Sequence, residues 1–300
     1  MQKKILILGA KGSLGGQLIK IFNDDCEVVA WDRGEIDITD NELILKKIND
    51  VKPDVIISAA AYNAVDRCET DEQQFELAKK LNGDAVGFLA QAAIEVGAIL
   101  VHYSTDYVFG GIANGTNNER MKQIKKQGGF KEDDKPCPVN KYGETKLMGE
   151  QEIIRRSGQG LKWYLIRTSK LFGPKGESEL AKPSFFDVIL QLSKKRDCID
   201  AVNGEMSCFT YTIDLAKATK KLLEGGYGYG IYHIVNSGPC TWYEAVVELF
   251  KIAGIDVKAN PVSSDKFPRP AKRPKYSVLL NTKFEQLRSW KEALREYLGK

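Results

Sequence analysis

The stretch KILILGAKGSLGGQLIKIF, residues 4–22, decides the fold that we expect of this chain. It begins with a short apolar run typical of a parallel strand that is buried on both faces. Gly9, Gly12 and Gly15 follow, and apolar residues then recur at helical spacing up to Phe22. Because glycines permit a tight turn and let backbone N–H groups approach a pyrophosphate at a helix N-terminus, this order predicts nucleotide binding. The alternative is a glycine-rich turn that holds no ligand.

An acidic residue ends the next expected strand, at residues 27–31. In sheets of this kind an acid such as Asp32 binds ribose hydroxyls, and an adjacent arginine such as Arg33 accommodates a 2′-phosphate. Having both residues predicts that NADH and NADPH are accepted; the alternative for Arg33 is a solvent-facing arginine without a ligand. Residues 37–40 then offer Thr and Asp side chains suited to a helix N-cap, and a helix is expected to about residue 48.

Strands and helices keep alternating along the chain. Strands are expected at 55–57, 98–103 and 163–167, and helices at 72–96, interrupted at 82–83, and at 142–156. Such alternation predicts a Rossmann-type, doubly wound parallel sheet of the α/β class, with its ligands at the carboxyl ends of the strands. Beyond residue 173 the alternation loosens, with helices expected at 184–194, 213–223, 241–252 and 289–297 and one strand at 230–235.

This loosening predicts a second, smaller unit. We expect residues 1–172 to form an NAD(P)-binding Rossmann domain, to which about 207–235 return. Residues 173–206 and 236–300 are expected to form a small C-terminal α/β substrate-binding domain.

A tyrosine and a lysine one helical turn apart carry the expected chemistry. Tyr142 and Lys146 lie on one face of the helix expected at 142–156. A phenol has an ordinary pKa of about 10, and we expect the neighbouring ammonium to lower it. Such an acid suits carbonyl reduction, in which a proton reaches oxygen as hydride reaches carbon. The hydroxyl of Thr105 would hold that oxygen. A Tyr-x-x-x-Lys pair is common by chance, and the upstream Ser-Thr-Asp and glycines give it weight.

Composition and charge are those of an ordinary soluble protein. The 300 residues are 43% apolar and 28% charged, with a formal net charge of +4. The basic residues are scattered, so no nucleic-acid partner is expected. No apolar run has the length of a membrane span and no signal peptide is recognised, so no membrane partner is expected either. The six cysteines form no C-x-x-C pair, which predicts reduced thiols and a cytoplasmic location.

No metal site is expected, because both histidines, His102 and His233, lie in apolar strand-like runs and are interpreted as core histidines. Residues 110–140 are expected to form a long connection, of the kind that is functional or mobile. Within it, Lys122–Lys126 is interpreted as a solvated loop. Residues 268–274 contain three prolines with arginines between them, and arginines on such a rigid segment suit a phosphate-bearing substrate. The alternative there is a solvated loop.

Several stretches together resemble one family. They are residues 59–69 (AAAYNAVDRCE), 102–109 (HYSTDYVF), 140–146 (NKYGETK), 167–169 (RTS), 241–243 (TWY) and 269–274 (RPAKRP). With the glycines at 9–15, they make nearly the whole chain similar to the extended short-chain dehydrogenases/reductases, and more narrowly to the dTDP-4-dehydrorhamnose reductases. The resemblance implies hydride transfer from NADPH or NADH to C4 of a dTDP-linked 4-keto sugar. A nucleotide sugar is therefore the expected substrate, and a homodimer is kept open beside a monomer.

The patterns and the resemblance together imply three sets of site residues. The catalytic set is Thr105, Tyr142 and Lys146. The cofactor-binding set is Gly9, Gly12, Ser13, Leu14, Gly15, Asp32, Arg33, Asp37, Ile38, Ala59, Ala61, Tyr62, Asn63, Tyr142 and Lys146. The substrate-binding set is Val65, Thr105, Asp106, Lys170 and Arg273.

Some positions depart from the family's pattern. Lys170 stands where the family commonly has a tryptophan that contacts the substrate, and residues 203–210 (NGEMSCFT), Ser58 and Asn63 also differ. The connection at 112–130 is longer than expected. All but Ser58 lie on or near the sugar side. Two alternatives therefore stay open: a reductase of a different nucleotide-linked keto sugar, and a non-catalytic relative like the regulatory subunit of a methionine adenosyltransferase.

Overall fold

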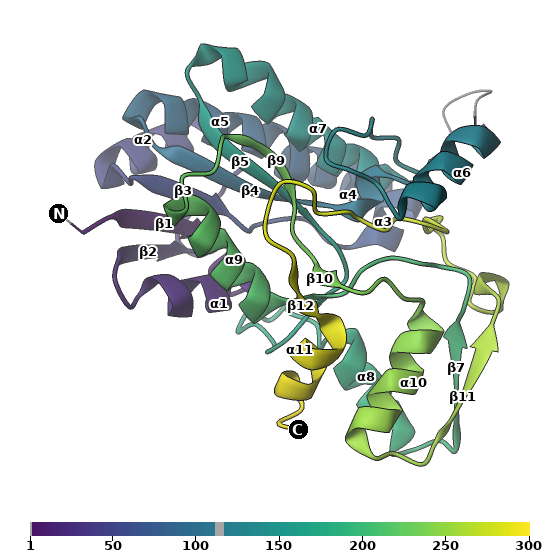
Figure 1. The fold of residues 1–300 in the computed structure, drawn as a ribbon. Coiled ribbons are helices and arrows are strands. Elements are labelled where there is room, and N and C mark those ends of the chain that lie inside the picture. The colour runs from purple at the N-terminus through teal and green to yellow at the C-terminus, as the bar shows by residue number, and fades with distance from the viewer. Residues whose placement is uncertain (1, 112–116) are drawn as a thin grey trace.

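The central element is a six-stranded parallel sheet in the order β2-β1-β3-β4-β5-β9 (Figure 1). The computed structural model describes residues 2–111 and 117–300. The strands are β1 (Lys4–Leu8), β2 (Glu27–Trp31), β3 (Val55–Ser58), β4 (Ile99–Thr105), β5 (Lys162–Thr168) and β9 (Gly230–His233). The chain runs from β1 outward to β2 and then returns to β3 on the other side of β1. The order thus reverses between β1 and β3, which is where ligands bind in such sheets.

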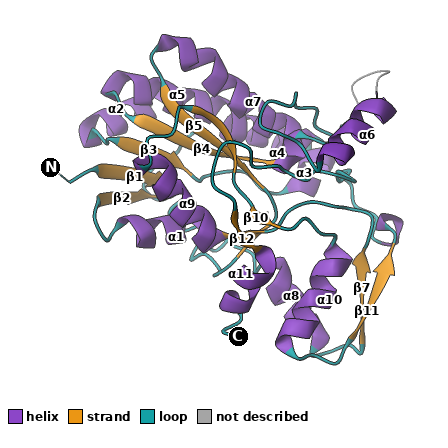
Figure 2. Ribbon diagram, in the orientation of Figure 1, coloured by secondary structure: helices purple, strands orange, loops and turns teal. Residues whose placement is uncertain are grey.

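Helices cover both faces of this sheet (Figure 2). Alternate residues of β1 point to opposite faces, so both faces need a cover. Leu6 and Leu8 belong to a core formed with α2 (Asn41–Val51), α5 (Ala85–Val96) and α7 (Lys141–Arg156). Ile5 and Ile7 belong to a core formed with α1 (Ser13–Phe22) and α9 (Thr212–Glu224). The expected doubly wound α/β fold is confirmed.

The interruption expected at 82–83 is a π-helical turn, Lys80–Asp84. It joins α4 (Glu72–Lys79) to α5, and a shorter helix, α3 (Val65–Thr70), precedes α4. The buried Asn82 amide accepts a hydrogen bond from Tyr62 N at 2.9 Å and donates to Tyr62 O at 3.1 Å and to Thr145 Oγ1 at 3.0 Å. Single π turns are rare and often lie at functional sites. Here the turn links the loop after β3 to helix α7.

The C-terminal part has an aromatic core of its own, built around Phe172, Phe186, Phe209 and Trp290. Its elements are α8 (Phe185–Ser193), β7 (Cys198–Val202), α10 (Trp242–Ala253), β11 (Lys258–Val262) and α11 (Trp290–Tyr297). The strands β7 and β11 pair in parallel at the lower right of Figure 1. Two short parallel pairs complete the strands: β6 (Leu171–Phe172) with β8 (Thr210–Tyr211), and β10 (Asn236–Ser237) with β12 (Leu287–Ser289).

The connection after β4 differs from expectation. Lys122–Lys126 is not a loop but part of helix α6 (Asn117–Gln127). Ile124 is buried on this helix in a cluster with Phe109, Phe130 and Val278. One apolar side chain per turn was too weak a periodicity to predict the helix, and burial against these residues stabilises it. Residues 112–116 lie outside the described part of the chain. Short 3₁₀ turns lie at Asp106–Val108, Ser157–Gln159 and Ser264–Lys266.

A buried ion pair joins β5 to α7. Arg167 donates from Nε and Nη2 to the two carboxylate oxygens of Glu150, at 2.9 and 2.7 Å, and both side chains are at most 1% exposed. Ser104 donates to the same carboxylate at 2.5 Å. The Arg167 guanidinium also lies 4.9 Å from the ring centroid of Phe109. These contacts fix α7 against the carboxyl halves of β4 and β5.

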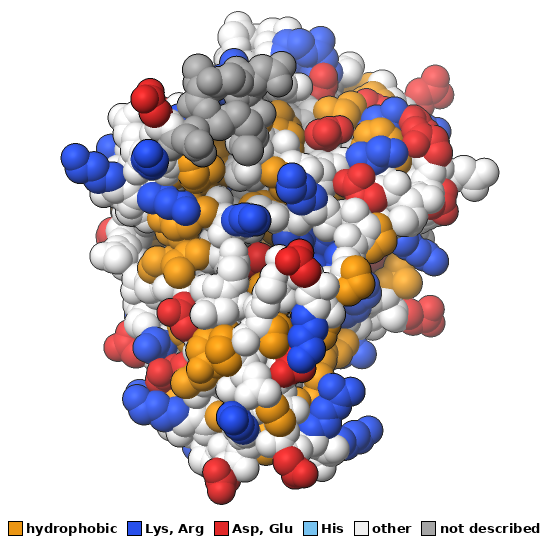
Figure 3. All heavy atoms as spheres, turned by 90° about the vertical axis from the view of Figure 1, so that its right-hand side faces the viewer, with side chains coloured by type: hydrophobic (Ala, Val, Ile, Leu, Met, Phe, Trp, Pro, Cys, Tyr) orange, Lys and Arg blue, Asp and Glu red, His pale blue; other side chains and the backbone are white. Residues whose placement is uncertain are grey.

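Two surface properties complete the description. No helix in residues 2–111 or 117–300 has both the length and the apolarity needed to cross a membrane. On the face in Figure 3, basic and acidic side chains are interspersed rather than gathered by sign.

Candidate active site

The glycine turn after β1 fits a dinucleotide pyrophosphate. Gly9 has φ +77, and a Cβ atom there would lie 2.7 Å from the backbone nitrogen of Ala60. The carbonyl of Gly9 similarly blocks any side chain at Gly15. Helix α1 starts after Gly12 without a side-chain cap, so the backbone N–H groups of its first turn, at Ser13 and Leu14, are free of such a competitor for an anion. This arrangement lies at the point where the strand order reverses.

Asp32, at the end of β2, lies against this turn. Its Oδ2 accepts a hydrogen bond from Lys11 N at 2.9 Å, while the adjacent Arg33 side chain is exposed. Asp37 is occupied locally: Thr39 N and Oγ1 both donate to its Oδ1 at 2.8 Å, and these bonds lower its pKa. The side chain of Ile38 packs in the core. The structure thus brings Asp32 to the glycine turn and leaves Asp37 engaged with its own loop.

The loop after β3 connects the glycine turn to Tyr142. Its first residues, Ala59 and Ala60, contact Gly9. Ala61 follows, and Tyr62 is held by Asn82. At the next position the side-chain amide oxygen of Asn63, Oδ1, accepts a long, 3.5 Å hydrogen bond from Tyr142 Oη.

Thr105 and Asp106 meet Tyr142 at the carboxyl end of β4. Thr105 is the last residue of β4, and Tyr142 lies in the first turn of α7, which Asn140 caps by accepting from Gly143 N at 2.8 Å. Gly143 is required because any side chain there would strike the Tyr107 carbonyl. The Thr105 hydroxyl donates to Asp106 Oδ1 and accepts from Tyr107 N, both at 3.2 Å, and it lies close enough to Tyr142 to offset part of the raised pKa of that phenol. The expected convergence of hydroxyl and phenol therefore exists in this fold.

One electrostatic expectation is wrong in this structure. The pKa of Tyr142 is raised, first by burial and then by its neighbours Tyr107 and Asp106. Lys146 does not lower it, because its Nζ donates to Tyr103 O at 2.7 Å and contacts His102 Nε2 at 3.2 Å. The helical spacing correctly put both residues on one face of α7. It did not show that acceptors on β4 would hold the ammonium.

Asp106 and Lys170 are the two charged residues that follow strands β4 and β5 where the sugar is expected to bind. Asp106 is buried, and Ser277 donates to it at 2.5 Å; burial raises the pKa of this carboxyl. Lys170 has φ +36, and its Nζ lies 3.7 Å from the ring centroid of Trp242. That Nζ is buried and has no hydrogen-bond partner in the described part of the chain. Burial lowers the pKa of Lys170 to about 8, while the charge of Asp106 opposes this.

The arginines of the proline-rich segment are already paired. Arg273 donates from Nη1 and Nη2 to the carboxylate of Asp66 at 3.0 and 2.8 Å, next to Val65 at the start of α3. Arg269 pairs with Glu205. The expectation that Arg273 faces a phosphate stays a prediction, since in this structure its fork is engaged by a carboxylate.

Sequence reasoning missed three residues of this site. Asn82 was seen only as an interruption, although a polar residue in the middle of an apolar helix was a usable signal. His102 was interpreted as a core histidine, and it is buried, yet it contacts Lys146. Ser277, which holds Asp106, lies 171 positions from it in the chain and carried no signal.

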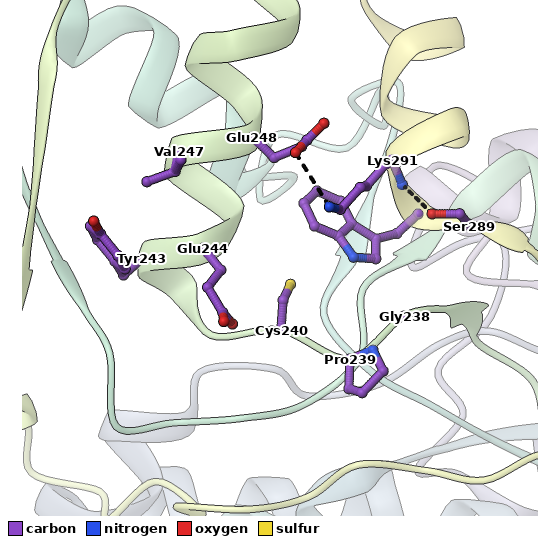
Figure 4. A pocket seen from close by; sticks show the side chains of 10 residues that line it. Gly238, Pro239, Cys240, Tyr243, Glu244, Val247, Glu248, Ser289 and Lys291 are labelled. Atoms are coloured by element: carbon purple, nitrogen blue, oxygen red, sulfur yellow. Dashed lines mark hydrogen bonds and ion pairs between the residues drawn. The ribbon is translucent and has the colours of Figure 1, made fainter. Parts of the chain in front are cut away.

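A pocket of about 440 Å³ lies elsewhere, between α10 and the start of α11 (Figure 4). Cys240 and Glu244 line it, with the ion pair of Glu248 and Lys291 at 3.3 Å. None of its lining residues belongs to the expected site sets. In the described residues, no group of three or more His, Cys, Asp or Glu side chains is placed to hold a metal ion.

Comparisons with known proteins agree with this geometry. The family model described as RmlD substrate binding domain matches residues 3–300. A dTDP-4-dehydrorhamnose reductase of Burkholderia thailandensis is 33% identical over 312 residues, covering 99% of this chain and 93% of that protein. A crystal structure of a dTDP-4-dehydrorhamnose reductase from Clostridium acetobutylicum is 38% identical with a TM-score of 0.85, covering 99% of this chain and 98% of that one. A Bacillus anthracis dTDP-4-dehydrorhamnose reductase, solved in complex with NADP, is 32% identical with a TM-score of 0.87 and 99% coverage of both chains.

Proposed function

The chain belongs to the RmlD substrate binding domain family, and on that premise we propose that it reduces the C4 keto group of dTDP-4-dehydro-L-rhamnose to give dTDP-L-rhamnose. The reductant is NADPH or NADH; the similar dTDP-4-dehydrorhamnose reductase from Bacillus anthracis was solved in complex with NADP. The observation that carries the proposal is the meeting of Thr105 and Tyr142 at the same sheet edge as the uncapped glycine turn. Both lie where a doubly wound sheet binds its ligands.

The chain's own residues would hold the dinucleotide at three places. The turn at Gly9–Gly15 and the first N–H groups of α1 take the pyrophosphate, since no side chain caps that helix. Asp32 takes a ribose hydroxyl, and the exposed Arg33 is free to reach a 2′-phosphate. Bound NADPH or NADH supplies the hydride. The small residues Ala59 and Ala61 let the backbone approach the flat nicotinamide.

Tyr142 is the proposed proton donor. Its raised pKa means that the phenol keeps its proton at neutral pH, as a general acid must. The Thr105 hydroxyl, beside it, positions the carbonyl oxygen that receives the proton. Lys146 lies on the same face of α7 as Tyr142, is held on β4 by the Tyr103 carbonyl, and would supply a positive charge. This charge stabilises the negative charge that develops on oxygen during hydride transfer.

Lys170 is the proposed contact to the sugar that sets this chain apart. Its Nζ is buried over Trp242 and lacks a hydrogen-bond partner in the described residues. A buried ammonium is costly without an acceptor, and a sugar oxygen would provide one. Replacing Lys170 by Trp exchanges that donor for apolar area. We expect Lys170→Trp to lower the KM for the 6-deoxy sugar; an unchanged KM would place Lys170 outside the sugar site.

We also propose that the chain is divided into the two domains that the alternation of strands and helices predicts. The separate aromatic core of residues such as Phe186 and Trp290 supports it, because the two cores that flank the main sheet involve other residues. Strand β6, at residues 171–172, pairs with β8, at residues 210–211. The second of these strands lies near residue 207, where the chain was expected to return to the first domain. The nucleotide sugar would bind between the two parts.

We also propose a cytoplasmic location for this chain. Six free cysteines support a reducing compartment, the cytoplasm. Interspersed surface charge supports a small-molecule partner rather than a nucleic acid (Figure 3). Both a monomer and a homodimer are consistent with this chain, and sedimentation separates them.

The direct test of the proposal is cofactor oxidation. Purified protein is mixed with NADPH or NADH and with dTDP-4-dehydrorhamnose made in situ, and absorbance loss is followed beside a Tyr142→Phe control. We expect turnover with the wild type and a loss of about 10²-fold or more with the control. If neither protein oxidises the cofactor above background, the assignment is overturned.

A further inference from the structure

His102 occupies a position between a catalytic lysine and the loop after β3. It lies in the middle of β4 and is 1% exposed. Its Nε2 is 3.2 Å from Lys146 Nζ, and its Nδ1 is 3.3 Å from Ser58 Oγ at the end of β3. The imidazole therefore bridges two groups rather than merely filling the core.

The hydrogen-bond partners determine which tautomer the ring adopts. A protonated Lys146 carries only donors, so Nε2 must be the acceptor. Nδ1 then carries the proton and donates it to Ser58 Oγ. The ring stays neutral, because burial and the adjacent charge of Lys146 both hold the pKa of His102 well below its ordinary value.

The same contacts define the state of Lys146. An ammonium has three N–H donors. Two are directed to β4, to Tyr103 O and His102 Nε2, which leaves one. Burial lowers the pKa of Lys146 to about 8, and the carboxylate of Glu150 on the same helix raises it. Glu150 is also paired with Arg167 of β5, and beside it the two neutral acceptors on β4, Tyr103 O and His102 Nε2, favour the charged amine.

We propose that His102 is a positioning residue for the proposed reductase activity: its neutral imidazole accepts from Lys146, keeps that amine protonated and fixes its position against β4, on the face of α7 that also carries Tyr142. The inference rests on the proposed function for its catalytic consequence and on geometry alone for the contact. In the described residues, the titratable and polar groups that act on Lys146 are His102 and the Tyr103 carbonyl from β4 and Glu150 from α7. Removing one acceptor should make Lys146 lose its proton at lower pH.

The kinetic test compares two variants of His102. Gln supplies an amide oxygen for Lys146 and an amide N–H for Ser58, whereas Leu supplies neither. The alkaline limb of the kcat profile should move down by about one pH unit in His102→Leu and stay within about 0.3 unit of wild type in His102→Gln. Val101→Ala is the matched control, since Val101 is the buried neighbour on β4 that faces the opposite core. It should lose stability without moving the limb.

If the alkaline limb of the kcat profile has the same midpoint pH in wild type and in His102→Leu, the proposal is overturned. Should His102→Leu fail to fold, ¹⁵N NMR of the wild-type histidines decides the contact without any activity. The chain has two histidines, and His233→Gln identifies the resonances of His102. We expect the neutral Nδ1–H tautomer, with an Nε2 shift that changes in Lys146→Met. An Nε2–H tautomer, or no change in Lys146→Met, would overturn the contact. Absence of turnover in the wild type would instead refute the proposed function and leave the NMR result standing.

Discussion

Neutralising Glu150 should strongly destabilise the fold around helix α7. Glu150→Gln keeps the shape of the side chain and removes its charge. In the wild type the Glu150 carboxylate accepts from Arg167 at 2.9 and 2.7 Å and from Ser104 at 2.5 Å, and water is excluded from the pair. Gln offers one acceptor oxygen, so the Arg167 guanidinium is left buried without a counter-charge.

The magnitude follows from burial. Breaking a buried ion pair by removing one partner costs about 3–5 kcal/mol, because the remaining charge is desolvated and uncompensated. We expect the free energy of unfolding, measured by urea titration, to fall by that amount. The double variant Glu150→Leu with Arg167→Met, which replaces both charges by apolar side chains, should recover most of the loss.

The matched control is Glu285→Gln. Glu285 also pairs with a cation, Lys221 at 2.6 Å, but both side chains are more than half exposed. Its urea midpoint should stay at the wild-type value. If Glu150→Gln unfolds at the same urea concentration as Glu285→Gln, the buried pair does not stabilise this fold and the reasoning fails.

Three further predictions concern the site and its pH dependence. Tyr142→Phe should lower kcat by about 10²–10⁴ with NADPH affinity kept, because the change removes the proton donor and, with it, a hydrogen bond to Asn63 that is 3.5 Å long; near wild-type turnover would exclude Tyr142 as the acid. Arg33→Ala should weaken NADPH binding by about 1–3 kcal/mol and spare NADH, as titration calorimetry can show; equal losses would exclude a 2′-phosphate contact. Burial and Arg167 lower the pKa of His233 from 6.5 to about 3, so between these values the unfolded chain binds a proton that the folded protein does not. The contribution of His233 to the free energy of unfolding is complete above pH 6.5 and falls by about 1.4 kcal/mol per pH unit below it. In His233→Gln the free energy of unfolding, measured by urea titration, should therefore depend less steeply on pH, by that amount per unit. Parallel pH curves would contradict it.

The Rossmann-type part was predictable because its signals are local. The apolar run 4–8, the glycines and the helix that follows are contiguous in the chain, and each element declares itself by periodicity. Strands β7 and β11 were missed for the opposite reason. Cys198 pairs with Lys258, and neither five-residue strand is apolar throughout, so only the long-range pairing makes them strands.

The convergence of the candidate site residues was predictable from the sequence, but their contacts were not. Thr105, Asp106 and Tyr142 converge as expected, since strand ends and helix starts meet at one sheet edge. The partners of Lys146 were not predictable, because they depend on which residues of β4 face α7. Ser277 reaches Asp106 from the far end of the chain, and no local pattern predicts such a contact.

The most direct test of the central claim is product identification in a complete reaction. The folded enzyme, shown to bind NADPH, is supplied with dTDP-4-dehydrorhamnose, and NADPH loss is compared with the sugar nucleotide formed, identified by NMR. We predict one dTDP-L-rhamnose for each NADPH oxidised, with both quantities abolished in parallel by Tyr142→Phe. A protein that binds NADPH yet forms no dTDP-L-rhamnose would contradict the account.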